Sequence, residues 1–281
     1  MGAMAESRAT GPRMTDPSAV WAYAVAERVP AAGLDELEGI EGGRVRAVPA
    51  AGLVAIAGDV PLSGFSEAAM RRNLEDLAWL EATARAHHRV IAAVAEDGPV
   101  VPLRLATVYR DDASTAAALA EFGGQFRSAL AQTRAHKEWG IKAYATRPAE
   151  PGAPDDGRGS SERGADRKSA GSGAAYLDRR RRELTAHEQA RRGVVAGAEL
   201  VHARLAGLAD QSRLHPPQSP QLAGHRAQML LNASYLLPDD RDGDFAAAVD
   251  ELAGQHGELR IEITGPWPPY SFAGLPEAGQ P

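Results

Sequence analysis

The chain has 281 residues, 44% of them hydrophobic and 5% aromatic, which is enough for one large or two small domains with a packed core. Its formal net charge of −6 argues against nucleic acid as the main partner, because phosphate binding needs a basic surface. The absence of cysteine excludes disulfides and thiolate chemistry, and the lack of an 18-residue apolar run or a signal peptide favours a cytoplasmic protein without a membrane span.

The first half of the sequence predicts an α+β domain over residues 20–137. Residues 1–19 are polar and rich in Gly, Pro and Ser, and we expect them to be disordered. The apolar run over residues 20–25 is typical of a buried strand. Residues 44–48 and 53–57 are typical of two strands joined as a hairpin.

After the hairpin, the spacing of the apolar residues is typical of helices. A helix is predicted from Ser66, with one apolar face made of Met70, Leu74, Leu77, Leu80 and Ala84. His87 and His88 are expected to begin the next helix as surface or boundary histidines. A strand over residues 100–105 comes next, and it contains Arg104. The Arg104 side chain either lies at the strand end and pairs with a carboxylate, or makes a polar contact with a partner. A last helix, capped at Asp111 and Asp112, carries Leu119, Phe122, Phe126 and Leu130 on one side.

The second half predicts a C-terminal domain over residues 138–272, followed by a tail over 273–281. Apolar residues nearly vanish over 147–172, which indicates a disordered, flexible insertion. A long helix over about 174–209 carries a coiled-coil-like seam of Val194, Ala198, Val201, Leu205 and Leu208. With the strands and the shorter helix around it, the order is β-α-β-β-α-β, which is typical of a ferredoxin-like domain.

No catalytic, cofactor-binding or metal-binding residue is predicted. His187 and Glu188 begin like the zinc motif H-E-x-x-H, but Arg191 stands in place of the second histidine. Phosphate-binding loops and the G-x-S-x-G motif are absent. The basic run that includes Arg179 and Arg180 is first of all solvated charge, with an acidic protein partner as the functional alternative and nucleic acid the least favoured.

The segment Gly265-Pro266-Trp267-Pro268-Pro269-Tyr270 is rigid and aromatic. Proline removes backbone donors, so this segment cannot join a central strand. It either folds back over the core and ties the domains together, or offers an exposed docking surface. The candidate partner-binding residues of the whole chain are Arg104, Arg179, Arg180, Trp267, Pro268 and Tyr270.

Four segments resemble one family, the GvpF/GvpL gas vesicle proteins. Residues 98–109 (GPVVPLRLATVY) resemble the family's V-x-P-L-R-F-G-T-V-F strand, although Leu105 and Ala106 stand where Phe-Gly is usual. Residues 138–144 (EWGIKAY) and 173–180 (GAAYLDRR) resemble its E-W-G-V-K and G-x-A-Y-L-x-x-R segments. Residues 261–272 (IEITGPWPPYSF) are similar to its T-G-P-W-P-P-Y-S-F ending.

The resemblance implies an α+β protein of two domains, the second ferredoxin-like, that acts in gas vesicles without catalysis. Its implied partners are the hydrophobic shell protein GvpA, which it would keep from aggregating during assembly, and other gas vesicle accessory proteins. An apolar groove or an edge strand would make the contact. The alternative is a small-molecule-binding enzyme or regulator on a ferredoxin-like domain, which a deep pocket with convergent polar groups would indicate.

Overall fold

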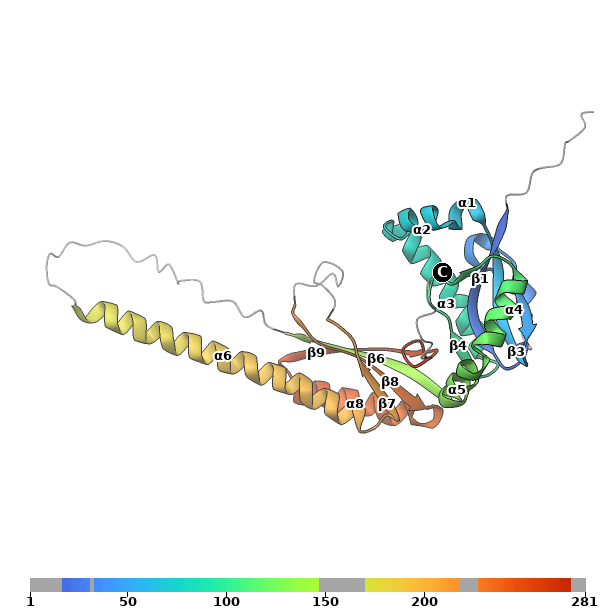
Figure 1. Cartoon of the computed structure of the whole chain (residues 1–281). Helices are drawn as coiled ribbons and strands as arrows, with labels where there is room; N and C mark the ends of the chain where they lie inside the picture. The colour runs from blue at the N-terminus through green and yellow to red at the C-terminus, as the bar shows by residue number, and fades with distance from the viewer. Residues whose placement is uncertain (1–16, 31–32, 147–169, 218–226, 274–281) are drawn as a thin grey trace, which may run out of the picture. The chain divides into compact units, whose positions relative to one another are not determined.

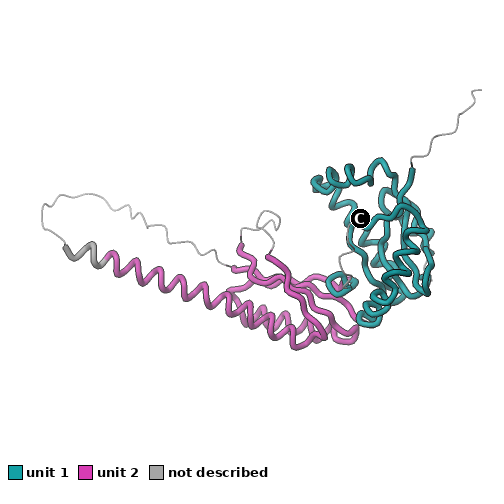
Figure 2. Tube along the Cα trace, viewed as in Figure 1, with its two compact units in different colours: residues 1–135, 268–281 teal, residues 136–267 magenta. Residues whose placement is uncertain are grey.

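The computed structural model describes residues 17–30, 33–146, 170–217 and 227–273. The predictions for residues 1–16, 147–169 and 274–281 lie outside this range. The chain divides into two compact units, one made of residues 1–135 together with 268–281 and the other of residues 136–267 (Figure 2). Residues 268–272 therefore belong to unit 1, whereas the sequence assigned them to the C-terminal domain.

Unit 1 contains, among its described residues, a five-stranded antiparallel sheet (Figure 1). The strand order is β2-β3-β1-β4, and β5 also pairs with β1. The strands are β1 (Ser18–Ala26), β2 (Val45–Ala50), β3 (Leu53–Pro61), β4 (Val100–Pro102) and β5 (Val108–Tyr109). The predicted hairpin is β2 and β3, which pair in antiparallel register. Ser18 and Ala19 are part of β1, so the prediction of disorder up to residue 19 is wrong there; Ala19 pairs with Val60 and is buried.

Some helices of unit 1 end at residues that the spacing of apolar residues did not predict. They are α1 (Leu62–Phe65), α2 (Glu67–Asn73), α3 (Leu77–Ala95), α4 (Asp112–Glu121) and α5 (Gly123–Thr133), with short 3-10 turns at Leu34–Glu36 and Ile40–Gly42. The predicted single helix from Ser66 ends at Asn73, because the Asp76 carboxylate accepts the backbone N–H groups of Ala78 and Trp79 and starts α3. Leu74 and Leu77 are therefore exposed.

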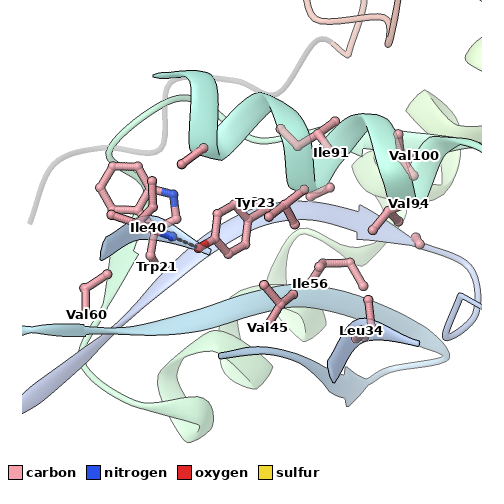
Figure 3. Packing of buried hydrophobic residues seen from close by; sticks show 14 of the residues in the cluster. Trp21, Tyr23, Leu34, Ile40, Val45, Ile56, Val60, Ile91, Val94 and Val100 are labelled. Carbon is pink, nitrogen blue, oxygen red and sulfur yellow. Dashed lines mark hydrogen bonds between the residues drawn. The ribbon is translucent and has the colours of Figure 1, made fainter. Parts of the chain in front are cut away.

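Helices cover both faces of the unit 1 sheet. One core cluster joins Trp21, Tyr23 and Ile56 of the sheet to Ile91 and Val94 of α3, as Figure 3 shows. The other cluster joins the opposite face to α4 and α5 through Leu119, Phe126 and Leu130. Because β1 is buried on both faces, its sequence is a continuous apolar run and not an alternating one.

Unit 2 has the element order β6, α6, β7, β8, α8, β9 in its described residues. These elements are β6 (His136–Ala145), α6 (Ala170–Ala206), β7 (Gln211–Leu214), β8 (Met229–Pro238), α8 (Asp242–Gln255) and β9 (Leu259–Trp267), with a 3-10 turn at Asp239–Arg241. Every pairing is antiparallel and the strand order is β7-β8-β6-β9. Residues 170–172, predicted as part of the flexible insertion, are helical.

The core of unit 2 lies between the sheet and its two helices. The seam predicted from the sequence supplies Ala198, Val201 and Leu205, which are buried against the sheet. Phe245 of α8 packs on Tyr235 of β8, with ring centroids 5.4 Å apart. Hydrophobic burial thus fixes only the C-terminal part of α6 to the sheet.

Candidate functional site

An open pocket in unit 1 brings together residues far apart in the sequence. It measures about 380 Å³ and lies between α3, the segment after β4 and the segment that follows Trp267. Its lining residues are Ala84, His87, His88, Pro102, Leu103, Arg104, Leu105 and Tyr270. The pocket thus combines apolar side chains with a guanidinium group, a phenol and two imidazoles.

His87 lines this pocket and is held by two hydrogen bonds. Trp21 donates its indole Nε1–H to His87 Nδ1 at 3.0 Å, so Nε2 carries the ring proton and donates to the Leu103 carbonyl, also at 3.0 Å. Burial lowers the pKa of His87 to about 4, so the ring is neutral near pH 7. Because both nitrogens are engaged, His87 is a structural residue and not a general base.

The prediction that His87 is a surface or boundary residue is wrong, since its side chain is only 4% exposed. It lies within α3 on the buried face that also carries Thr83, Val90 and Ile91. A reading of residues 77–95 as one helix would have placed it there, because these positions recur at spacings of three and four.

Tyr23 supports the core beside His87. Its hydroxyl accepts the backbone N–H of Ile40 at 2.9 Å, and its ring centroid is 5.5 Å from that of His87. Burial raises the pKa of Tyr23. A Cβ atom added at Gly39 would lie 2.5 Å from the hydroxyl, so only glycine fits there.

Arg104 follows β4 and lines the pocket. The strand ends at Pro102, two residues before Arg104, and not at Leu105 as the sequence predicted. The Leu103 N–H still donates to the Tyr23 carbonyl at 2.9 Å, but beyond it the chain turns. The Thr107 hydroxyl donates to the Arg104 carbonyl at 2.7 Å, which fixes this turn and leaves the Arg104 side chain exposed.

Tyr270 also lines the pocket. Its hydroxyl lies 2.9 Å from His88 Nδ1, within hydrogen-bonding distance. Partial burial lowers the pKa of His88. The segment that carries Tyr270 is anchored by Phe272 and Ala273, which are buried, and Ala273 belongs to the core cluster of unit 1. The sequence did not indicate that His88 would line the same pocket as Tyr270.

The other predicted partner-binding residues have separate surroundings. Arg179 and Arg180 lie on α6 of unit 2, each within 4 Å of Glu183, at 3.9 Å and 3.6 Å. Trp267 is the last residue of β9, which is an edge strand, and its side chain is 38% exposed. Pro268 is half-buried and begins the segment that leads to Tyr270. Of the six predicted residues, the structure shows Arg104 and Tyr270 lining one pocket.

Within the residues that the structure describes, no group of three or more His, Cys, Asp or Glu side chains is arranged to hold a metal ion. No helix within the same ranges combines the length and the apolar character needed to span a bilayer.

Comparison with known proteins identifies the family. Residues 19–274 match the model of the family described as gas vesicle synthesis protein GvpL/GvpF. Gas vesicle protein L of a Streptomyces species is 38% identical over 239 residues, which are 85% of this chain and 86% of that protein. Gas vesicle protein F of a Streptomyces species is 28% identical over 209 residues, covering 70% of this chain and 80% of the relative.

Solved structures show the same fold. The crystal structure of gas vesicle protein GvpF from Microcystis aeruginosa aligns with a TM-score of 0.61 at 18% identity, covering 92% of this chain and 99% of that one. GvpF from an Anabaena species aligns with a TM-score of 0.63, also at 18% identity, covering 92% of this chain and 98% of that one. The sequence match and the common fold together show that the chain belongs to the GvpL/GvpF family of gas vesicle proteins.

Proposed function

We propose that this protein is a non-catalytic accessory or minor structural component of gas vesicles that binds the hydrophobic shell protein GvpA. It assists nucleation or assembly by covering the apolar surface of GvpA until the shell grows, and so prevents its aggregation. It works in the cytoplasm and at the gas vesicle, together with other gas vesicle accessory proteins. Membership of a family of gas vesicle synthesis proteins over residues 19–274 supports this proposal.

We also infer that the chain has two domains and that unit 2 is a ferredoxin-like domain. Support comes from its β-α-β-β-α-β element order, its strand order β7-β8-β6-β9 and its uniformly antiparallel pairing. The division into two compact units supports the two-domain description.

The pocket lined by Arg104 and Tyr270 is the proposed contact site. One observation carries this assignment: Arg104 and Tyr270 come from residues 98–109 and 261–272, two of the segments that resemble the family, and they line the same pocket. Ala84, which is exposed, and Leu105, which is half-buried, supply apolar surface beside them, so hydrophobic burial would drive the contact and Arg104 would orient it.

A groove contact is better supported than strand pairing at β4. This strand has three residues and lies at the edge of its sheet, but it ends in Pro102, which has no N–H to donate. An added strand would therefore find few backbone partners there.

The test is co-purification with tagged GvpA at low and at high salt. We expect binding that survives high salt in the unchanged protein, and a strong loss of binding in the variants Arg104→Ala and Tyr270→Ala. Arg71→Ala is the matched control, because Arg71 is an exposed arginine on α2 that pairs with Glu67 within the helix.

Three outcomes would count against the proposal. Absence of binding at either salt concentration would rule out direct contact with GvpA. Binding lost only at high salt would show that charge, and not apolar burial, makes the contact. Equal binding by the two pocket variants and the control would place the contact elsewhere on the protein.

A further inference from the structure

Much of helix α6 extends beyond the sheet of its own unit, as Figure 1 shows. Ala198, Val201 and Leu205 are at most 3% exposed, whereas Leu177 and Leu184 nearer the N-terminal end are 60% and 49% exposed. We name residues 176–192 the α6 arm. At 1.5 Å per residue, a helical segment of this length spans roughly 25 Å. The arm therefore offers a long helical surface that the core of unit 2 does not cover.

The arm continues the line of the buried seam. Steps of three and four residues lead back from Val194 to Arg191, His187, Leu184, Arg180 and Leu177. On a helix these positions share one side. One stripe of the arm thus carries two exposed leucines together with Arg180, His187 and Arg191, which is the pattern of a helix-pairing surface that includes charge.

The arm is basic within an acidic protein. It contains six arginines and three carboxylates, while the whole chain has a formal net charge of −6. Its ion pairs are internal to the helix and exposed, such as Arg192 with Glu188 at 3.5 Å, and exposed pairs of this kind contribute little to stability. The excess of positive charge favours a surface that carries carboxylates.

A second copy of the chain is a poor occupant. In a parallel pair of identical helices, the same seam positions face each other, so Arg180 would meet Arg180 and Arg191 would meet Arg191. An antiparallel pair would place the leucines against the basic positions of the other copy. The parallel pair brings like charges together, and the antiparallel pair packs arginines against leucines without a carboxylate partner, so both are disfavoured, whereas glutamates on a different helix would pair with these arginines.

We propose that the α6 arm is a docking site for an acidic amphipathic helix of a partner protein. Leu177 and Leu184 pack on the partner's apolar stripe, and Arg180 and Arg191 pair with its flanking carboxylates. This inference concerns unit 2 and does not depend on the assignment of the Arg104 pocket.

The probe is a fluorescently labelled synthetic helical peptide with leucines at heptad seam positions and glutamates beside them. Its binding to the full-length protein is measured by fluorescence anisotropy, with a peptide carrying lysines in place of the glutamates as control. We expect the acidic peptide to bind and the basic peptide to bind at least about tenfold more weakly, since like charges face each other.

Matched variants test the seam itself. Leu177→Ala combined with Leu184→Ala should weaken binding by about tenfold or more, because the apolar anchors are lost. Leu200→Ala is the apolar control, because Leu200 is 61% exposed on a different side of α6. Arg180→Glu should weaken binding more than Arg182→Glu, which makes the same charge change on the side of the arm that faces away from the seam.

Several outcomes would overturn the proposal. These are no binding of the acidic peptide, equal binding of both peptides, and equal losses in seam variants and controls. Light scattering that shows a dimer dissociated by the double leucine substitution would instead identify the arm as a self-association surface. Binding of anionic lipid vesicles in preference to the acidic peptide would identify a lipid surface.

Discussion

The hydrogen bonds of His87 make a specific prediction about stability and pH. In the folded protein, burial disfavours the charged form of His87. Protonation would also put a second N–H of the ring against the indole N–H of Trp21. The pKa of His87 is therefore about 4 in the folded state, against 6.5 for an ordinary histidine. Between these values the unfolded chain binds a proton that the folded chain does not.

The sign and size of the effect follow from linkage. This contribution is fully present above pH 6.5 and is lost as the pH falls towards 4, so acid destabilises the protein. The difference in pKa corresponds to roughly 3 kcal/mol in total, of which about 2 kcal/mol is lost between pH 7 and pH 5.

Urea denaturation at pH 7, 6 and 5 measures this dependence. His87→Gln is the informative variant, because the amide can accept from Trp21 and donate to the Leu103 carbonyl without taking up a proton. We expect its free energy of unfolding to fall by about 2 kcal/mol less than that of the unchanged protein between pH 7 and pH 5. His187→Gln, on the α6 arm, is the control for loss of a histidine outside the core.

Carboxylates that titrate between pH 5 and pH 7 affect the unchanged protein, His87→Gln and His187→Gln alike. The difference in pH dependence between the unchanged protein and His87→Gln therefore measures the contribution of His87. An identical pH dependence in His87→Gln and in the unchanged protein would refute the reasoning. It would mean that His87 takes up its proton in the folded state as easily as in the unfolded chain.

Substitutions at Tyr23, Gly39 and Leu205 test the packing of the two cores by thermal or urea denaturation. Tyr23→Phe removes the acceptor of the Ile40 N–H and should cost about 1–3 kcal/mol of unfolding free energy; no loss would show that another group accepts this bond. Gly39→Ala should cost about 1–3 kcal/mol, because its Cβ would approach the Tyr23 hydroxyl to 2.5 Å, and the double variant with Tyr23→Phe should recover part of it. Leu205→Ala should cost about 2–5 kcal/mol and Leu200→Ala less than about 0.5 kcal/mol, since only Leu205 is buried; similar losses would contradict the seam geometry.

The helix boundaries show where sequence patterns mislead. Leu74 and Leu77 fit the spacing of one helical face with Met70, yet the Asp76 cap begins a new helix between them and both side chains are exposed. The predicted helix from Asp112 likewise divides, because Phe122 ends α4 and α5 begins at Gly123. Apolar spacing cannot distinguish one helix from two that meet at a capping residue.

The sequence alone determined the secondary-structure elements whose formation depends on residues close together in the chain. The apolar run of β1, the β2–β3 hairpin and the buried seam of α6 follow from side-chain periodicity, and the element order of unit 2 follows from their succession. The segment 261–272 and the strand after Gly98 likewise carried the family resemblance. Only the tertiary structure placed His87 in the core, assigned the segment after Trp267 to unit 1 and brought Arg104 and Tyr270 to one pocket. These outcomes depend on contacts between residues up to 182 positions apart, such as His88 with Tyr270, and no pattern of neighbouring residues encodes which distant segments pack together.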